Sequence, residues 1–185
     1  MSTRWLGIAM IIGTLAFIVQ DLIYDVEMGN TSSRLALLLF CVGGICGVTG
    51  LIKLNALGSN TVARALGFVP MIGFAALALG AALKLSEVIT LDDSLGNILP
   101  AIGWIMMLAG MLIVGILTIA ARNWQGWRRF VPLLSILVIP VGLALGARLG
   151  NDDVGGAISF TGFLLLGIVI ATFQSAPAPD GVVAA

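Results

Sequence analysis

Six apolar stretches of about twenty residues, with no charged residue near their middle, alternate with short polar segments along the chain. A helix needs roughly 20 residues to cross the hydrocarbon core of a bilayer. Each stretch is apolar around its whole circumference, which is typical of a membrane span and not of an amphipathic helix. The alternating strands of a transmembrane barrel are not found in the sequence. The pattern predicts an all-α integral membrane protein, a bundle of six transmembrane helices at residues 5–24, 35–54, 65–85, 98–121, 127–147 and 154–174.

The connections between these stretches are too short for a separate soluble domain, so residues 1–174 are predicted to form a single six-helix transmembrane domain. Residues 175–185 hold two prolines among small residues, which predicts a disordered C-terminal tail. The first apolar stretch follows a basic residue, as in a signal peptide. Because no cleavage site of small residues comes after it, we interpret it as an uncleaved helix.

The chain matches itself when it is shifted by about sixty residues. In this register Gly13 aligns with Gly73 and Gly43 with Gly103, and a third, weaker copy needs small shifts. Chance identity is the alternative, because the chain is rich in leucine, alanine and glycine. We favour three tandem two-helix hairpins of one orientation, at about residues 1–60, 61–122 and 123–174.

Glycine is abundant, with 24 residues among 185. Helices in lipid associate by close packing, which favours small residues at their contacts. Several glycines recur at helical spacing, and we expect them to pack the helices of this bundle against one another; a dimerisation face is the alternative. The predicted stripes are Ala9-Gly13-Ala16, Gly43-Gly47-Gly50, Gly73-Ala76-Gly80 and Gly142-Gly146-Gly150.

The charged residues make up only 10% of the chain, and they cancel to a formal net charge of zero. This balance gives no indication of a nucleic-acid partner. Their placement is uneven. Six of the nine basic residues fall at the ends of spans that share a side with the N-terminus, namely Arg4, Lys53, Arg64, Arg122, Arg128 and Arg129.

Eight of the nine acidic residues fall on the opposite side: Asp21, Asp25, Glu27, Glu87, Asp92, Asp93, Asp152 and Asp153. The positive-inside rule then places both termini in the cytoplasm, and we expect the protein in a bacterial plasma membrane. Trp5, Trp124 and Trp127 lie at the expected cytoplasmic boundary, where an indole ring anchors in the headgroup region.

Residues that could carry chemistry are scarce in the predicted spans. Histidine is absent from the chain, and no charged residue lies in the middle of a span. The hydroxyls of Thr14, Thr49, Ser135 and Thr161 are expected to bond to carbonyl groups of their own helices. Cys41 and Cys46 are five residues apart, on different faces of one helix, and we interpret them as buried thiols. We therefore predict no catalytic, cofactor-binding or metal-binding residue, and no enzyme.

The acidic residues on the side opposite the N-terminus can be interpreted as a cation site or as helix caps. The set Asp21, Tyr24, Asp25 and Glu27, with the Asp-Asp pairs at 92–93 and 152–153, could collect a divalent cation. The spacing matches no calcium loop. We favour helix N-caps for the two Asp-Asp pairs.

Pro140 lies near the middle of the fifth span, where it predicts a kink. A static bend is favoured, and a moving hinge is the alternative.

The sequence favours a multi-pass membrane protein without a catalytic site, either a structural or accessory subunit or a bundle that binds lipid or an apolar ligand. The alternative is a small transport component for a neutral or amphipathic solute. The expected partner is the lipid bilayer, with other membrane subunits or a second copy of the chain left open. Convergent polar groups in a cavity at the acidic end would favour transport.

Overall fold

A computed structural model of the protein describes residues 2–23, 31–86 and 94–173, without the side chains of 94–97. The acidic residues predicted at 25, 27, 87, 92 and 93, Tyr24, and the tail at 175–185 lie outside the described residues. All regular secondary structure in the described chain is helical. Its elements are α1 (Thr3–Ile23), α2 (Thr31–Lys53), α3 (Thr61–Leu66), α4 (Phe68–Leu85), α5 (Ser94–Ala121), the 3-10 helix η1 (Gly126–Phe130), α6 (Val131–Leu149) and α7 (Asp152–Thr172).

Six of the helical segments are long and apolar enough to cross a membrane, as the sequence predicts. The third segment, Thr61–Leu85, combines α3 and α4, which meet at Gly67. The fifth, Gly126–Leu149, combines η1 and α6. The fourth helix begins at Ser94, four residues before the predicted start, so Pro100 lies inside α5. This proline removes one backbone N–H from the helix and leaves the carbonyl of residue 96 without its usual donor.

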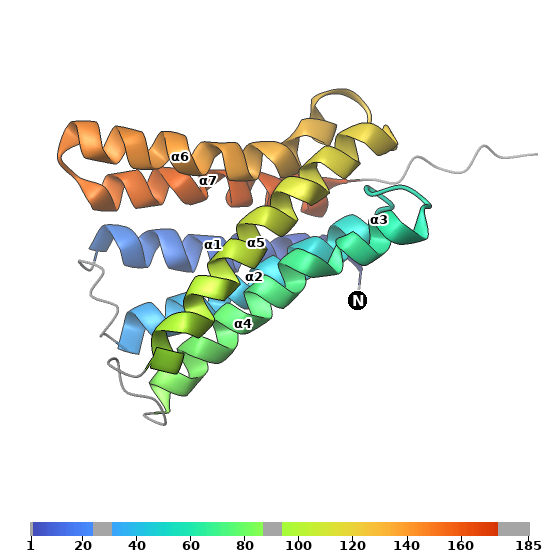
Figure 1. Ribbon diagram of the computed structural model, residues 1–185. Helices are drawn as coiled ribbons and strands as arrows, with labels where there is room; N and C mark the ends of the chain where they lie inside the picture. The colour runs from blue at the N-terminus through green and yellow to red at the C-terminus, as the bar shows by residue number, and fades with distance from the viewer. Residues whose placement is uncertain (1, 24–30, 87–93, 174–185) are drawn as a thin grey trace, which may run out of the picture.

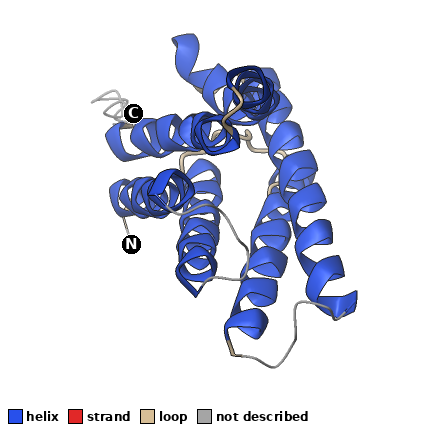
Figure 2. Cartoon of the chain, turned by 90° about the vertical axis from the view of Figure 1, so that its left-hand side faces the viewer, coloured by secondary structure: helices blue, strands red, loops and turns tan. Residues whose placement is uncertain are grey.

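The six long helices pack as a ring in the order α1, α2, α4, α5, α6 and α7, with α7 returning to α1. Figure 1 shows α6 and α7 side by side, with α1 beneath α7, and α5 running obliquely across the bundle. In the view of Figure 2 the α4–α5 pair is inclined to the α6–α7 pair. The contact between α5 and α6 is made where Gly115 meets Leu133, near the end of α5. Toward its own N-terminus α5 diverges from α6 (Figure 1).

Two helix starts are capped by an asparagine side chain. The side chain of Asn60 accepts a hydrogen bond from the amide of Val62 (2.8 Å), at the start of α3. The side chain of Asn151 accepts one from Val154 (3.0 Å), at the start of α7. The prediction that Asp152 and Asp153 are N-caps is therefore wrong: they occupy the first turn, where their charge complements the helix dipole. No side chain caps α4, which continues from α3 through Gly67.

Glycines form the contacts between neighbouring helices, as predicted. A Cβ atom on Gly43 would lie 2.9 Å from the carbonyl oxygen of Ala9 and 3.4 Å from the Cα of Gly13, so α1 and α2 touch backbone to backbone. Gly73 and Gly103 bring α4 and α5 together in the same way. Further glycine contacts join α6 to α7 through Gly142, Gly146 and Gly155, and α1 to α7 through Gly7 and Gly167.

Gly150 does not belong to the predicted glycine stripe of the fifth span. It has a left-handed backbone (φ 64°) at the C-terminus of α6, and no atom would approach an added Cβ within 4 Å. This conformation is one that residues with side chains rarely adopt, so its glycine terminates the helix.

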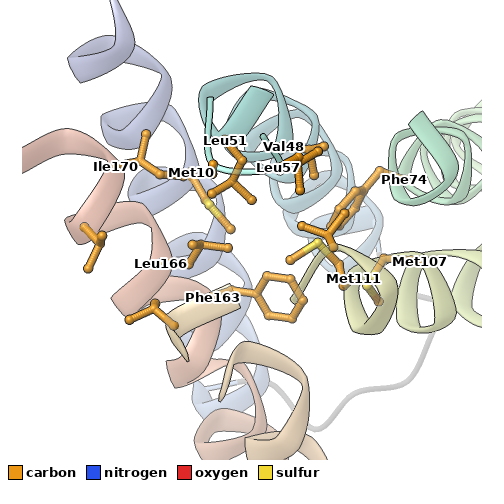
Figure 3. Close-up of a cluster of buried hydrophobic side chains, with 14 of the residues drawn as sticks. Met10, Val48, Leu51, Leu57, Phe74, Met107, Met111, Phe163, Leu166 and Ile170 are labelled. Atoms are coloured by element: carbon orange, nitrogen blue, oxygen red, sulfur yellow. The ribbon is translucent and has the colours of Figure 1, made fainter. Parts of the chain in front are cut away.

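The core lies where α1, α2, α4, α5 and α7 meet (Figure 3). Its centre is Phe40 on α2, whose ring lies within 5.2–5.6 Å of the rings of Phe17, Phe74, Phe160 and Phe163. Aromatic pairs of this kind contribute about 0.5–1.5 kcal/mol each beyond their buried area. Met10, Met107 and Met111, all fully buried, fill the space around these rings.

Pro140 lies inside α6, as expected, and a polar contact joins α6 to α7 beside it. The hydroxyl of Ser159 on α7 donates to the carbonyl of Ile139 (3.1 Å) and to that of Gly155 (2.8 Å). Gly142 packs against the same serine, leaving no room for a Cβ. This packing holds α6 against α7 beside Pro140, and the predicted kink stays a prediction.

Substitution of Gly43 or Gly73 by leucine should destabilise the bundle by about 1–3 kcal/mol or more, because the added side chain would overlap backbone atoms that cannot rotate away. Thermal unfolding of detergent-solubilised protein measures the effect. Ala75→Leu, at an exposed site on α4, is the matched control and should leave the midpoint nearly unchanged. Equal midpoints for Gly73→Leu and Ala75→Leu would contradict the role of these glycines.

Candidate functional site

A cavity of about 70 Å³ lies near one end of the bundle, between α1, α2, α4 and α5. It is large enough for roughly five water molecules. Half of the residues around it are apolar and half are polar or charged. They are Phe17, Gln20 and Asp21 from α1, Ser33, Arg34 and Leu37 from α2, Ala81 and Lys84 from α4, and Pro100 and Trp104 from α5.

The apolar part of the wall belongs to an aromatic cluster that leads into the core. The ring of Phe17 meets that of Phe160 edge to face at 4.7 Å, and the Trp104 ring lies 6.1 Å from Phe160. Phe40 contacts both Phe17 and Trp104 from the core side. The aromatic rings therefore close the cavity toward the middle of the bundle.

The helices around the cavity are cross-linked by polar contacts. Gln20 on α1 donates its side-chain amide to the hydroxyl of Ser33 on α2 (3.2 Å), and both residues are buried. Arg34 on α2 donates to the backbone carbonyl of Lys84 on α4 (2.5 Å). Buried polar groups need such partners, since an unpaired one costs about 1–3 kcal/mol.

Three charged side chains from three helices line the cavity. Lys84 is only 9% exposed, although it lies in the last turn of α4, and Arg34 and Asp21 are partly buried. The Asp21 carboxylate packs against Gly156 on α7, and its Oδ2 has no hydrogen-bond partner in the part of the chain that the structure describes. The cavity therefore carries two cations and one carboxylate.

The cavity lies at the end of the bundle where α1 and α4 finish and α2 begins, which is the end predicted to be extracytoplasmic. The sequence correctly indicates that the charges stay near helix ends, but it did not single out Gln20, Ser33, Arg34 and Lys84 as neighbours. One signal was available in the sequence: all four residues lie at or near the ends of apolar spans, where a polar residue is unfavourable unless it has a partner.

Three of the four span hydroxyls that were predicted to bond within their own helices do so. Thr49 donates to the carbonyl of Ile45 (2.8 Å), and Ser135 and Thr161 donate to carbonyls three residues earlier (2.7 Å each). Ser159, which was not among the predicted hydroxyls, also donates to a carbonyl of another helix.

The other end of the bundle has a wider, more open hollow of about 440 Å³ beside the α2–α3 connection. The side chain of Asn123 donates to the carbonyl of Asn55 (2.8 Å), and Arg64 donates to the side chain of Asn55 (3.1 Å). These bonds hold the polar connection between α2 and α3 against the end of α5. The polar groups around the hollow are therefore used to hold these segments together.

The tryptophans at that end do not all behave as predicted. Trp5 and Trp127 are 59% and 58% exposed, as interfacial anchors should be. Trp124 is buried, with 1% exposed, and stacks on Phe173 at 5.1 Å. Its expected role at the membrane boundary is wrong, because the connection before η1 folds inward and the C-terminal end of α7 covers the indole.

Residues that could hold a metal do not gather in the described chain, where no three His, Cys, Asp or Glu side chains come together. Both cysteines are free thiols; Cys41 is buried, as predicted, and Cys46 is only half-buried.

The Gln20–Ser33 bond can be tested by a double-mutant cycle. We expect Gln20→Ala and Ser33→Ala each to lower stability, with a coupling free energy of about 1 kcal/mol between them. Chemical unfolding in detergent gives the four free energies. Thr161→Ala is the control, since its exposed hydroxyl bonds only within α7. Additive effects of the two changes would show that the bond contributes nothing.

The comparisons with known proteins give no family for this chain: it matches no protein-family model, no curated protein and no solved structure.

Proposed function

We propose that the protein is a non-catalytic membrane helix bundle that binds a lipid or another apolar ligand with a polar end. The observation that carries this proposal is the cavity between α1, α2, α4 and α5, whose lining is divided between aromatic and charged side chains. Sites for small molecules are concave and largely apolar, with a few polar groups that fix the orientation of the ligand.

The position of the cavity also supports an amphipathic ligand. Arg34 and Lys84 lie at the ends of apolar helices, the depth at which long basic side chains reach the headgroup region of a bilayer. Phe17 and Trp104 lie toward the core from them. A molecule with a polar head and an apolar body would find both environments in this order.

A transport component is the second candidate, and the convergence of five polar residues around a cavity at one end favours it. A solute moving through the bundle would have to pass the rings of Phe17, Trp104 and Phe160, which close the inner side. Pro140 lies on α6, outside the cavity, and its neighbour Ile139 is bonded to α7. Binding therefore requires no rearrangement, whereas transport does.

The charges divide between the two ends of the bundle, and this division supports an orientation. Asp21, Arg34, Lys84 and Arg148 lie at the cavity end, and six basic residues lie at the other end, with the N-terminus. The proposal places the cavity on the outer side of a bacterial plasma membrane and both termini in the cytoplasm. Accessory subunits or a second copy of the chain would contact the exposed apolar helix faces.

The repeat remains part of the proposal. Gly13 packs at Gly43 between α1 and α2, and the aligned Gly73 packs at Gly103 between α4 and α5. Equivalent residues thus make equivalent contacts in the first two hairpins, which supports a common origin for these two units.

Filling the cavity should abolish ligand binding. Leu37→Trp places a larger side chain in its wall, whereas Leu39→Trp, 49% exposed on the same helix, is the matched control. Native mass spectrometry after purification from membranes should show a retained lipid on the wild type and on Leu39→Trp but not on Leu37→Trp. Equal retention by all three proteins, or none by the wild type, would contradict binding in the cavity.

Orientation can be tested by labelling with a membrane-impermeant maleimide in intact cells. In a background with Cys41 and Cys46 replaced by alanine, Ser86→Cys at the cavity end should be labelled, and Ser59→Cys at the other end should not. Both positions are exposed in the structure, so labelling of both after permeabilisation is the control. The opposite pattern would reverse the orientation.

A further inference from the structure

We infer that the connection between α5 and α6, residues 122–130, binds the phosphate headgroup of an acidic phospholipid at the end of the bundle opposite the cavity. The inference rests on the proposed insertion of the helices in a bilayer, but not on ligand binding in the cavity. It is carried by three arginines of the connection, Arg122, Arg128 and Arg129, and by the exposed apolar stripe on α6 that begins beside them.

The end of the bundle that holds this connection is strongly basic. Figure 1 shows the connection at the same end of the molecule as the N-terminus and α3. Six basic side chains belong to this end, and eight of the nine acidic residues belong to the other. The ninth is Asp180, which follows α7 and lies outside the described residues. One carboxylate cannot balance six cations, so positive charge is in excess here whichever group Asp180 faces.

The acidic residues of the two connections at the cavity end do not alter this count. Residues 24–30 join α1 to α2, and residues 87–93 join α4 to α5. With 21 residues, α1 is about 30 Å long. A connection of seven residues spans at most roughly 30 Å even when fully extended. It is therefore too short to run to the basic end and return.

Aromatic rings, and not acidic side chains, hold the arginines of the connection. The guanidinium of Arg128 lies 5.8 Å from the centroid of the Phe173 ring, and that of Arg129 lies 4.7 Å from the Phe130 ring. The acidic side chains that the structure describes all lie at the cavity end of the bundle. A ring attracts a cation but carries no net charge, so these contacts position the arginines and leave their charge uncompensated.

The connection is a tight turn that presents its cations together. Arg122 and Gly126 have left-handed backbones (φ 54° and 65°), and η1 packs against both α5 and α6. Arg122 and Arg128 are exposed. The planar guanidinium group donates hydrogen bonds in a geometry that matches the oxygens of a phosphate.

An exposed apolar stripe begins at the arginines and continues along α6. Its members recur every three or four positions, so they share one helix face. They are Trp127, Phe130, Leu134, Leu137 and Val141, each between 38% and 58% exposed. An acyl chain lying on this stripe would place the headgroup of its lipid at Arg128 and Arg129, which stand between the first two members in the sequence.

The excess of positive charge selects an acidic headgroup. The phosphodiester of phosphatidylglycerol brings one negative charge, whereas phosphatidylcholine brings a cation of its own that the arginines repel. Clusters of basic residues beside a membrane helix attract acidic lipids of the cytoplasmic leaflet. The proposed orientation puts the connection at that leaflet.

The test compares phosphatidylglycerol and phosphatidylcholine with identical acyl chains. Because the site lies on the surface of the bundle, its lipid exchanges with detergent, so each lipid is added to delipidated full-length protein and binding is measured by native mass spectrometry. We expect phosphatidylglycerol to bind at least about tenfold more tightly, since hydrogen bonds to a charged group are at stake. Excess inorganic phosphate should not displace it, because the free ion makes no contact with the stripe. Displacement would overturn a lipid as the source of the phosphate.

Variants distinguish a site from diffuse charge. Arg128→Gln with Arg129→Gln should lower the phosphatidylglycerol affinity to that for phosphatidylcholine, and lysine at both positions should restore most of it. The matched control, Arg4→Gln with Arg64→Gln, removes two exposed cations from the same end and should change the affinity less than about twofold. Equal losses in the two glutamine pairs would overturn the inference.

The outcomes also separate this inference from the cavity proposal. Equal affinity of the wild type for the two lipids would overturn the headgroup site, whatever the cavity binds. Leu37→Trp, which fills the cavity, should keep the preference for phosphatidylglycerol. Loss of the preference in Leu37→Trp would place the acidic lipid in the cavity and overturn the site at the connection. The wild-type comparison needs no variant, so it tests the inference even if an arginine variant fails to fold.

Discussion

The bundle depends on the close approach of helix backbones at glycine. In lipid, burying apolar side chains against one another offers little advantage over leaving them among acyl chains, so helices associate through packing at short range. The pairs Gly13–Gly43 and Gly73–Gly103 let the two helices of the first and second hairpins approach at this short range. Because any side chain at these positions would overlap backbone atoms, the glycines determine which helices are neighbours.

The cavity is a consequence of where this close packing ends. Gly80 on α4 still touches Pro100 on α5: a Cβ atom added to Gly80 would lie 3.2 Å from the Cγ of the proline. Beyond that point larger polar residues replace the glycines, and the helices cannot approach as closely. Gln20 with Ser33, and Arg34 with the carbonyl of Lys84, then hold the helix ends by hydrogen bonds instead. The same change from small to polar residues opens the space and supplies the charges that line it.

The aromatic cluster separates this polar end from the rest of the interior. Phe40 contacts rings from four other helices and closes the centre of the bundle. Arg34 and Lys84 lie toward the end of the bundle, and Phe17 and Trp104 lie toward its core. The rings therefore divide a polar end of the interior from an apolar centre.

The sequence by itself determined six helices long and apolar enough to cross a membrane and the placement of charge near their ends, because these properties depend on the local run of side chains and on the cost of dehydrating them. It also indicated the packing role of the glycines. Only the tertiary structure decided that Trp124 is buried, that Asn151 and not the following aspartates caps α7, and that Ser159 bonds across to α6. The cavity belongs to this second group. Arg34 and Lys84 are fifty residues apart, and they meet only because α2 and α4 pack together, a pairing that no local pattern of hydrophobic and polar residues specifies.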